Sequence, residues 1–260
     1  MDKEDKYLMS SLYNSLELLD LLSEHKELRP IDISKLLNLS KASVFKMLYT
    51  LEKKNYVHKL VNGKYCLGLK FAHYGSIAIE THNIYDIVKP YLQRLRDEHN
   101  ETTHLGILDN DLNTLFMMKE SSNASIHMIS SVGARVPFHV TALGKVMAAF
   151  NLNEEFINRI RSYNFVKFNE NSITDFDSFM KVLHKTKEQG YGEDLEENEI
   201  GLVCYAVPVI DIHGDAIAAL SISGPSYRMF SNKDKLIESL KKTSKEVSQA
   251  LGYNAKIMNL

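Results

Sequence analysis

Three stretches with apolar residues at helical spacing, followed by a hairpin signal, fill residues 1–67 and restrict the folds open to this chain. Leucines three and four residues apart predict an amphipathic helix over 7–24. The residues of this apolar stripe are Leu8, Leu12, Leu16, Leu19 and Leu22. Pro30 suits the first turn of a second helix because it has no N–H to lose. The buried face of that second helix is expected to hold Ile33, Leu36 and Leu37.

A third helix is predicted after the turn 38–40, where the Ser40 hydroxyl can cap its first turn. Its apolar stripe, expected to pack on the first two helices, consists of Val44, Met47, Leu48 and Leu51. The outward face is formed by Lys41, Ala42, Phe45, Lys46 and Tyr49, with Ser43 at its margin. Cations attract phosphates, Lys donates to guanine edges, and apolar groups contact thymine methyls. This face therefore suits the major groove of DNA.

The sequence Val61-Asn62-Gly63 joins two β-prone runs, 56–60 and 64–67, and predicts a hairpin with lysines on both arms. Helices followed by such a hairpin are typical of a winged helix-turn-helix. A helical oligomerisation domain with an accessory hairpin is the alternative. The residues expected to contact DNA are Lys35, Ser40, Lys41, Ser43, Phe45, Lys46, Tyr49, Lys59, Asn62 and Lys64.

The distribution of charge supports this interpretation, although the net charge of −2 alone does not. Residues 1–75 contain 12 Lys/Arg and 9 Asp/Glu, a net +3, whereas residues 76–260 contain 19 and 24, a net −5. Within 33–70, eight lysines stand against one acid, Glu52. A basic block on an acidic body is typical of a nucleic-acid-binding module. A lysine-rich solvated face gives the same counts.

The size and composition of the chain exclude several classes. Its 260 residues fit two domains, and no apolar run approaches the roughly 18 residues of a membrane span. The charged N-terminus does not resemble a signal peptide, and the only cysteines, Cys66 and Cys204, are too few for a disulfide framework. We therefore expect a soluble, cytoplasmic protein with reduced thiols and no membrane contact.

The rest of the chain predicts an α+β body with a mainly antiparallel sheet. A connecting helix is expected over 68–82, and a helix over 84–99 that Pro90 kinks or breaks. The predicted strands are 103–108, 112–118, 125–130, 202–210 and 216–223. The predicted helices are 142–150, 175–189 with Thr174 as its cap, and a closing helix over 231–251.

Three segments of this body resemble the signature of the IclR-type transcription regulators. They are the run 133–145 (Gly-Ala-Arg-Val-Pro-Phe-His-Val-Thr-Ala-Leu-Gly-Lys), the stretch 190–209 with Gly190-Tyr191-Gly192-Glu193-Asp194 and Ala206-Val207-Pro208-Val209, and Ser221-Ile222-Ser223-Gly224-Pro225 followed by Arg228. The resemblance covers nearly the whole chain in order. It implies a winged helix-turn-helix (1–67), a linker helix (68–82) and a GAF-like effector-binding domain (83–260). It also implies dimers, often paired into tetramers, that bind palindromic operators in double-stranded DNA.

The third helix departs from the family pattern in one respect. Where the family usually has Ser-Thr-Val-Tyr-Arg, this chain has Ala42-Ser43-Val44-Phe45-Lys46. Lys46 lacks the planar guanidinium fork that binds guanine bidentately, so guanine recognition at this position is expected to be weaker.

The resemblance also implies an effector site. Its polar contacts would be Asp194, Cys204, Ser221 and Ser223, with backbone amides from Gly133 and Ala134. Ser221 and Ser223 lie two apart in a predicted strand and so share one face. Buried hydroxyls need partners, which either a small polar ligand or the neighbouring backbone can provide. We expect a small organic or aromatic acid as the effector.

Other functions find less support. Of the catalytic motifs considered, the chain has no nucleophile elbow, Walker loop, dinucleotide-binding glycine pattern or His-Glu-x-x-His. The acids at 193–197 are expected to form a solvated loop, and His104, His127, His139 and Cys204 lack metal-ligand spacing. We expect no catalytic residue, metal or cofactor. The predicted function is a sequence-specific repressor or activator; the alternatives are an enzyme, a ligand-binding module with a helical head, or an interaction protein.

Overall fold

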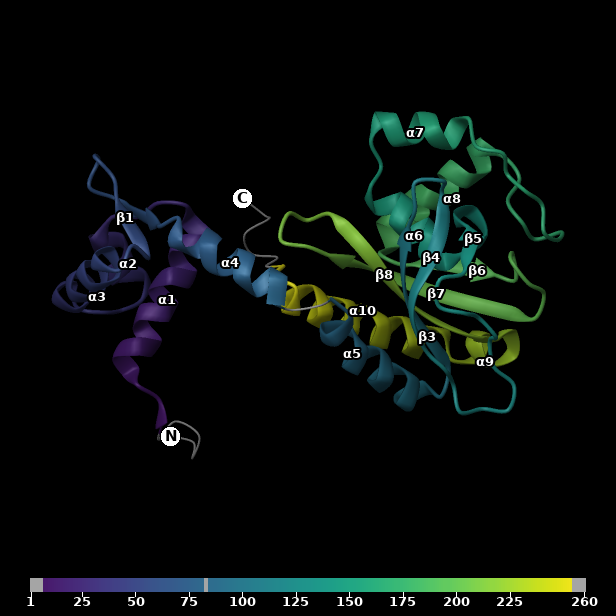
Figure 1. Ribbon diagram of the computed structural model, residues 1–260, viewed down its shortest axis with the longest axis horizontal. Helices are drawn as coiled ribbons and strands as arrows, with labels where there is room; N and C mark the ends of the chain where they lie inside the picture. Colours follow the sequence, from purple (N-terminus) through teal and green to yellow (C-terminus); the bar gives the residue numbers. More distant parts are fainter. Residues whose placement is uncertain (1–6, 82–83, 254–260) are drawn as a thin grey trace. The chain divides into compact units, whose positions relative to one another are not determined.

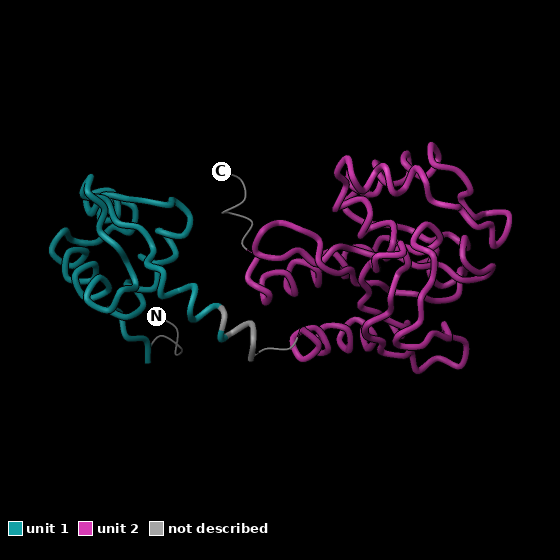
Figure 2. The backbone as a smooth tube through the Cα atoms, turned by 45° about the horizontal axis from the view of Figure 1, so that its top comes forward, with its two compact units in different colours: residues 1–82, 255–260 teal, residues 83–254 magenta. Residues whose placement is uncertain are grey.

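The computed structural model describes residues 7–81 and 84–253, which form two compact units (Figures 1 and 2). The smaller unit contains the N-terminal residues up to the end of the linker helix, and the larger unit starts with the helix that follows. Within the described residues, no helix combines the length and the apolar character that a membrane span requires.

The smaller unit has the predicted winged helix-turn-helix. Its elements are α1 (Ser10–His25), α2 (Pro30–Leu36), α3 (Lys41–Lys53), β1 (Val57–Lys59) and β2 (Tyr65–Leu67). The strands pair antiparallel with Val57 opposite Leu67, and Leu28 adds a short bridge to Tyr65. The Ser40 hydroxyl caps α3 as predicted, because it accepts a hydrogen bond from the Ser43 amide at 3.1 Å. The helix α4 (Lys70–Thr81) follows the hairpin.

The predicted buried face of α1 is wrong over half of its length. Leu12 and Leu16 are exposed, whereas Leu18 and Leu22 are buried with Ile33. The N-terminal half of α1 extends past α2 and α3 (Figure 1), and its Leu12 and Leu16 are exposed.

The second helix also buries less than expected. Leu36 is exposed, because α2 has only seven residues and directs Ile33 alone fully into the core.

The larger unit has an antiparallel sheet in the order β5-β4-β3-β8-β7-β6. Its strands are β3 (Thr102–Leu108), β4 (Asn113–Glu120), β5 (Arg135–Pro137), β6 (Gly192–Leu195), β7 (Leu202–Ile210) and β8 (Ala216–Pro225). The helices α5 (Ile84–His99) and α10 (Lys233–Ala250) cover one face, and α6 (Ala142–Phe150) lies against the other (Figure 1). The remaining helical elements are the 3-10 turn η2 (Phe138–Val140), α7 (Glu154–Arg161), α8 (Phe176–Gln189) and α9 (Ser226–Ser231).

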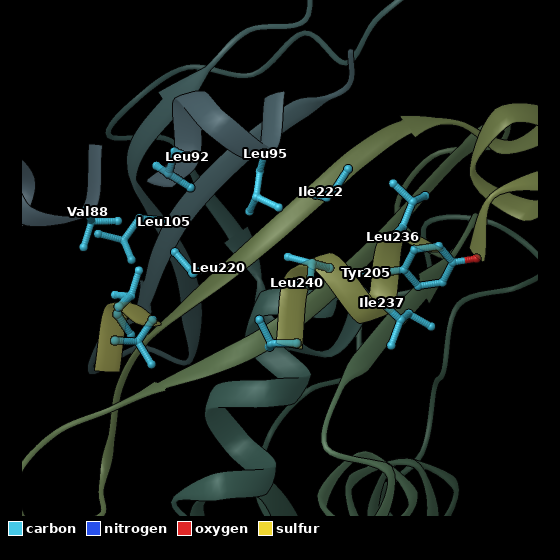
Figure 3. Packing of buried hydrophobic residues seen from close by; sticks show 14 of the residues in the cluster. Val88, Leu92, Leu95, Leu105, Tyr205, Leu220, Ile222, Leu236, Ile237 and Leu240 are labelled. Atoms are coloured by element: carbon cyan, nitrogen blue, oxygen red, sulfur yellow. The ribbon is translucent and has the colours of Figure 1, made fainter. Parts of the chain in front are cut away.

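The two faces of this sheet differ in chemistry. Under α5 and α10 the strands direct Leu105, Tyr205, Leu220 and Ile222 into a continuous apolar layer with Leu92 (Figure 3). Because side chains alternate along a strand, the residues between them point to the α6 side. These residues are His104, Cys204, Ser221 and Ser223, together with the apolar Ala206 and Ala219. A half-polar face is therefore buried under α6.

One strand and one loop predicted for the larger unit are wrong. Residues 125–130 form a loop, since the place beside β4 is taken by β5. The acids at 193–197 do not form a solvated loop, because Glu193 and Asp194 belong to β6 and are buried with Glu197.

Two helix predictions also need correction. Pro90 does not break α5, which runs through it while Val88 and Leu92 pack on the sheet on either side. The cap of α8 is Asp175 and not Thr174, because its carboxylate accepts from the Ser178 amide at 2.9 Å. The closing helix predicted over 231–251 is confirmed as α10, and the short helix α9 precedes it.

The close packing of α6 makes a prediction about Gly144. A Cβ at Gly144 would lie 2.3 Å from the Phe138 carbonyl oxygen and 2.6 Å from the Thr114 hydroxyl, both in fixed positions. Alanine normally favours a helix by about 1 kcal/mol over glycine, but this clash outweighs that gain. We expect Gly144→Ala to lower the free energy of unfolding by at least about 2 kcal/mol in urea denaturation followed by circular dichroism.

The matched control is Gly75→Ala in α4, where a Cβ would meet nothing within 4 Å. This variant should be unchanged or more stable by about 0.5–1 kcal/mol. Equal stability of the two variants would contradict the packing argument.

Candidate functional site

The outward face of α3 is held by the burial of Val44 and Leu48 on the opposite side. Phe45 is 63% exposed and its ring stacks on Tyr49 with centroids 6.4 Å apart. Lys41 and Lys46 are exposed, and no residue of the described chain forms a hydrogen bond or an ion pair with either ammonium group. The face therefore carries uncompensated positive charge next to exposed aromatic surface.

The remaining residues predicted on the helical head fall into two groups. Lys35 is exposed on α2 and lies on the surface as expected. The Ser40 and Ser43 hydroxyls lie 2.9 Å apart and also complete the cap of α3. Both serines have a structural role at the start of this helix.

Local hydrogen bonds define the turn at the tip of the hairpin. Gly63 adopts φ +77° and its amide donates to the Leu60 carbonyl at 3.0 Å, while the Asn62 side chain accepts from the Lys64 amide. The Lys64 ammonium pairs with Glu27, so it ties the hairpin to the rest of the unit. Lys59 lies 5.9 Å from the Tyr65 ring centroid and is the lysine of this hairpin that remains available.

A second candidate site lies on the α6 side of the large sheet. A small cavity there is lined by Phe116, Met128, Thr141, Ala142, Leu143, Asp194, Asn198, Cys204, Ser221 and Ser223. The four side chains that the resemblance implied are therefore brought together. Strand pairing explains this, since Asp194 lies opposite Cys204 and Cys204 opposite Ser223. The cavity has a volume of about 20 Å³, enough for a water molecule.

Asp194 is the buried acid of this cavity, with 2% of its surface exposed. Its carboxylate accepts from the Glu197 amide at 2.8 Å, and more weakly from the Asn198 amide at 3.4 Å. Burial raises the pKa of Asp194 to about 7, although the nearby Lys145 ammonium and these amides oppose the shift. The group can therefore be protonated near neutral pH and act as a hydrogen-bond donor.

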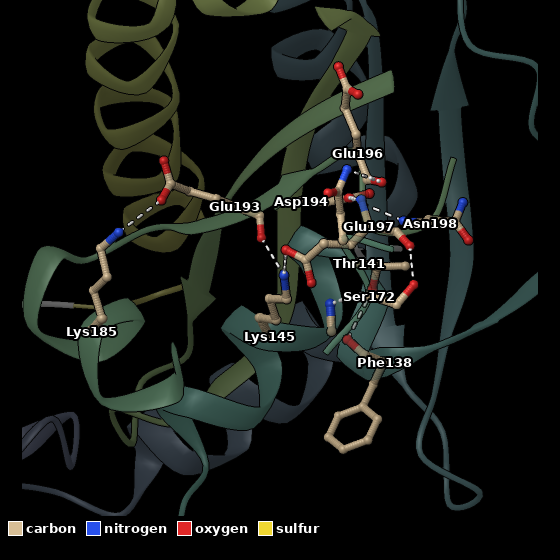
Figure 4. A network of polar contacts seen from close by, with 12 residues as sticks. Phe138, Thr141, Lys145, Ser172, Lys185, Glu193, Asp194, Glu196, Glu197 and Asn198 are labelled. Atoms are coloured by element: carbon tan, nitrogen blue, oxygen red, sulfur yellow. Dashed lines mark hydrogen bonds and ion pairs between the residues drawn. The ribbon is translucent and has the colours of Figure 1, made fainter. Parts of the chain in front are cut away.

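Beside Asp194 lies an ion pair that sequence reasoning missed. Lys145 of α6 is only 1% exposed, donates to the Glu193 carbonyl at 2.7 Å and pairs with the Glu197 carboxylate (Figure 4). The Ser172 hydroxyl fixes the same segment by donating to the Glu197 carbonyl at 2.8 Å. Lys145 was part of the family signature, but nothing in its local sequence indicated burial.

Cys204 lies between Asp194 and Ser223 in the strand register. Burial raises the pKa of its thiol well above the ordinary range. The thiol is therefore neutral and contributes a weakly polar surface to the cavity.

His104 was also missed as a site residue. It lies opposite Ser221, its Nδ1 is 3.5 Å from the Ser221 hydroxyl, and its Nε2 is 2.8 Å from the Ser130 hydroxyl. Burial lowers the pKa of His104 to about 3, so the imidazole is neutral. The alternation of the predicted strand could place His104 on one face, but only the pairing with β8 brings it to Ser221.

The Gly133 and Ala134 amides, which the resemblance implied as ligand contacts, are hydrogen-bonded within the protein. The Gly133 amide donates to the Phe116 carbonyl at 2.8 Å and the Ala134 amide to the Ser131 carbonyl at 3.1 Å. Neither residue lines the cavity. The Gly133 amide holds the loop 121–134 against β4, and the Ala134 amide closes a turn within the loop, so both amides are already hydrogen-bonded in this structure.

The histidines considered as metal ligands lie in separate environments. The His139 ring packs among Tyr163, Phe165 and Phe179, and His127 bonds to the Ala124 carbonyl. Throughout residues 7–81 and 84–253, no three His, Cys, Asp or Glu side chains lie together as a metal site requires.

Comparison with known proteins agrees with this architecture. The family model for the bacterial transcriptional regulator IclR C-terminal domain matches residues 76–249, and that for the IclR helix-turn-helix domain matches residues 11–60. The transcriptional regulator XynR of Escherichia coli K12 is 36% identical over 95% of this chain and 99% of its own length. The regulator KdgR of the same strain is 32% identical over 95% and 94%.

Solved structures give the same result for the fold. The IclR protein of Thermotoga maritima is 30% identical, with a TM-score of 0.62 over 95% of this chain and all of its own. A putative IclR regulator from Silicibacter sp. TM1040 has a TM-score of 0.87 over 95% of this chain and 97% of its own. At 19% identity, it shows the fold alone.

The raised pKa of Asp194 makes a prediction about stability. Folding raises this pKa from 3.8 to about 7, so between these values the folded chain holds a proton that the unfolded chain lacks. The free energy of unfolding of the wild type therefore falls as pH rises through this window. Asp194→Asn keeps an oxygen for the Glu197 amide and removes the titration. Its stability relative to wild type should rise by up to about 1.4 kcal/mol per pH unit between about pH 4 and 7.

Urea denaturation at several pH values measures this difference. Asp215→Asn serves as the control, because Asp215 is exposed in the turn between β7 and β8. A difference between Asp194→Asn and wild type that stays constant with pH would contradict the assignment.

Proposed function

The chain belongs to the IclR family of bacterial transcription regulators, and we propose that it recognises a palindromic operator through α3 and the β1–β2 hairpin under the control of a small organic acid bound in the cavity. The observation that carries the proposal is the exposed face of α3, where Phe45 and Tyr49 lie near Lys41 and Lys46, whose ammonium groups have no ion pair among the described residues. We further propose that the protein acts in the cytoplasm as a dimer or tetramer, as a regulator and not as an enzyme.

The chemistry of α3 suits a DNA groove. Exposing Phe45 and Tyr49 to water does not help the unit fold, since the core uses Val44 and Leu48. Lys41 and Lys46 supply the positive charge that phosphates attract, and a lysine such as Lys46 can also donate to a base edge. In the hairpin, Lys59 and Asn62 would contact phosphate, while Lys64 positions the hairpin through Glu27.

The chemistry of the cavity indicates the effector class. A protonated Asp194 and the Ser221 and Ser223 hydroxyls are donors that suit the oxygens of a carboxylate or hydroxyl group. The neutral His104 adds a further polar group behind Ser221. A ligand with two carboxylates would either be repelled by an ionised Asp194 or raise the pKa of Asp194 further. A monocarboxylate therefore fits the cavity better.

The size of the cavity implies that the effector displaces part of its wall. A volume of about 20 Å³ does not admit an organic acid. Met128 lines the cavity from the loop 121–134, and methionine side chains adapt readily to new shapes. We propose that movement of this loop connects effector binding to control of DNA binding.

DNA binding tests the first part of the proposal. The probe is a duplex library with a random central region, from which the full chain selects its preferred sequence. Lys46→Ala should weaken binding to the selected duplex by about 1–3 kcal/mol if Lys46 reaches a base, as measured by fluorescence anisotropy at physiological salt. Lys89→Ala, an exposed lysine of α5, is the control and should bind normally. Unchanged affinity of Lys46→Ala would remove α3 from the reading role.

Thermal stability tests the second part. The full chain is heated with a panel of two- to seven-carbon monocarboxylic, hydroxy and aromatic acids, because a true ligand raises the midpoint by mass action. For the acid with the largest shift, Ser221→Ala with Ser223→Ala should weaken binding by about 1–3 kcal/mol for each lost hydrogen bond. Binding of DNA without the acid should barely change. If the double variant binds the acid with wild-type affinity, the cavity is not the effector site.

A further inference from the structure

An apolar groove runs along the outward face of the helix-turn-helix. It is lined by Pro30, Ile31, Lys41, Ala42, Phe45 and Lys46, which come from the start of α2 and from α3. Its floor is hydrophobic, with Ile31 40% exposed and Phe45 63% exposed. Lys41 and Lys46 are the charged residues of its wall.

This groove does not contribute to the core of the unit. The buried cluster beneath it consists of residues from the opposite faces of the same helices, including Ile33, Val44 and Leu48. Phe45 has its stacking contact with Tyr49 on the surface. Large apolar side chains held in water at a concave, positively charged surface mark a place where another molecule is contacted.

We propose that this groove reads thymine through its 5-methyl group. The inference rests on the proposed role of α3 in the major groove. There, a thymine presents its methyl group and O4, and the methyl is the apolar feature that a hydrophobic floor can recognise. Ala42 is small enough to let a base edge approach, while Ile31 and Phe45 supply the apolar contact.

The charges around the groove determine which molecule is expected there. Lys41 and Lys46 lack carboxylate partners in the described part of the chain, which leaves their ammonium groups available for phosphates. To bind this groove, a protein segment would need acidic residues beside an apolar side chain. DNA, in contrast, carries backbone phosphates at every base pair. The charge pattern, together with the helix-turn-helix family match, therefore favours a DNA base edge.

Removing single methyl groups from DNA tests the proposal. The probe is the duplex that the wild-type chain selects from a random library, with each thymine replaced in turn by deoxyuridine, which lacks only the methyl group. We expect at least one thymine in each half-site whose replacement weakens wild-type binding about fourfold, the effect of burying one such carbon. For Phe45→Ala, the same replacement should change affinity less than about 1.5-fold.

Leu36→Ala provides the matched control, because Leu36 is an exposed apolar residue of α2 outside the groove. It should keep the full methyl dependence. The inference is overturned if no thymine replacement affects the wild type, or if Phe45→Ala retains the wild-type methyl effect. Failure of the proposed function itself is distinct, since the wild-type chain would then select no sequence, or Lys46→Ala would bind the selected duplex normally.

Discussion

The antiparallel register of β7 and β8 is the constraint on which the larger unit depends. It places Cys204 opposite Ser223 and Ala206 opposite Ser221. A slip of one residue would turn Leu220 and Ile222 into the cavity and both serine hydroxyls into the apolar layer under α5 and α10. Each hydroxyl without a partner there would cost about 1–3 kcal/mol. The burial of leucine and isoleucine on one face thus fixes the position of the polar groups on the other.

The sequence allowed prediction of features that depend on local spacing. The Ser40 cap, the Asn62-Gly63 hairpin and the shared face of Ser221 and Ser223 follow from a few neighbouring residues. Features that depend on the arrangement of distant segments were missed or wrong. His104 reaches Ser221 only through the β3–β8 pairing, and the leucine stripe of α1 is exposed at Leu12 and Leu16 although Leu22 is buried.

The polar side of the sheet contains a buried network whose charges compensate each other. Removing ions from water costs several kcal/mol each, and the attraction between Lys145 and Glu197 offsets this only with good geometry and further hydrogen bonds. The contact of Lys145 with the Glu193 carbonyl and that of Ser172 with the Glu197 carbonyl provide such bonds. A protonated Asp194 adds no charge to the network.

The loop 121–134 differs from the other walls of the cavity in how it is held. The sheet and α6 are fixed by close packing, as the contacts of Gly144 show. The loop is held mainly by hydrogen bonds, from His104 and Lys119 to Ser130 and from Arg228 to the Ile126 carbonyl. Each of these hydrogen bonds contributes about 0.5–1.5 kcal/mol to stability. Replacing them with contacts to a ligand therefore costs less free energy than disrupting the packing of the core. We therefore propose that expansion of the cavity begins in this loop. Arg228 also pairs with Glu101, the residue just before β3, so a rearrangement of the loop would be transmitted to the sheet through this ion pair.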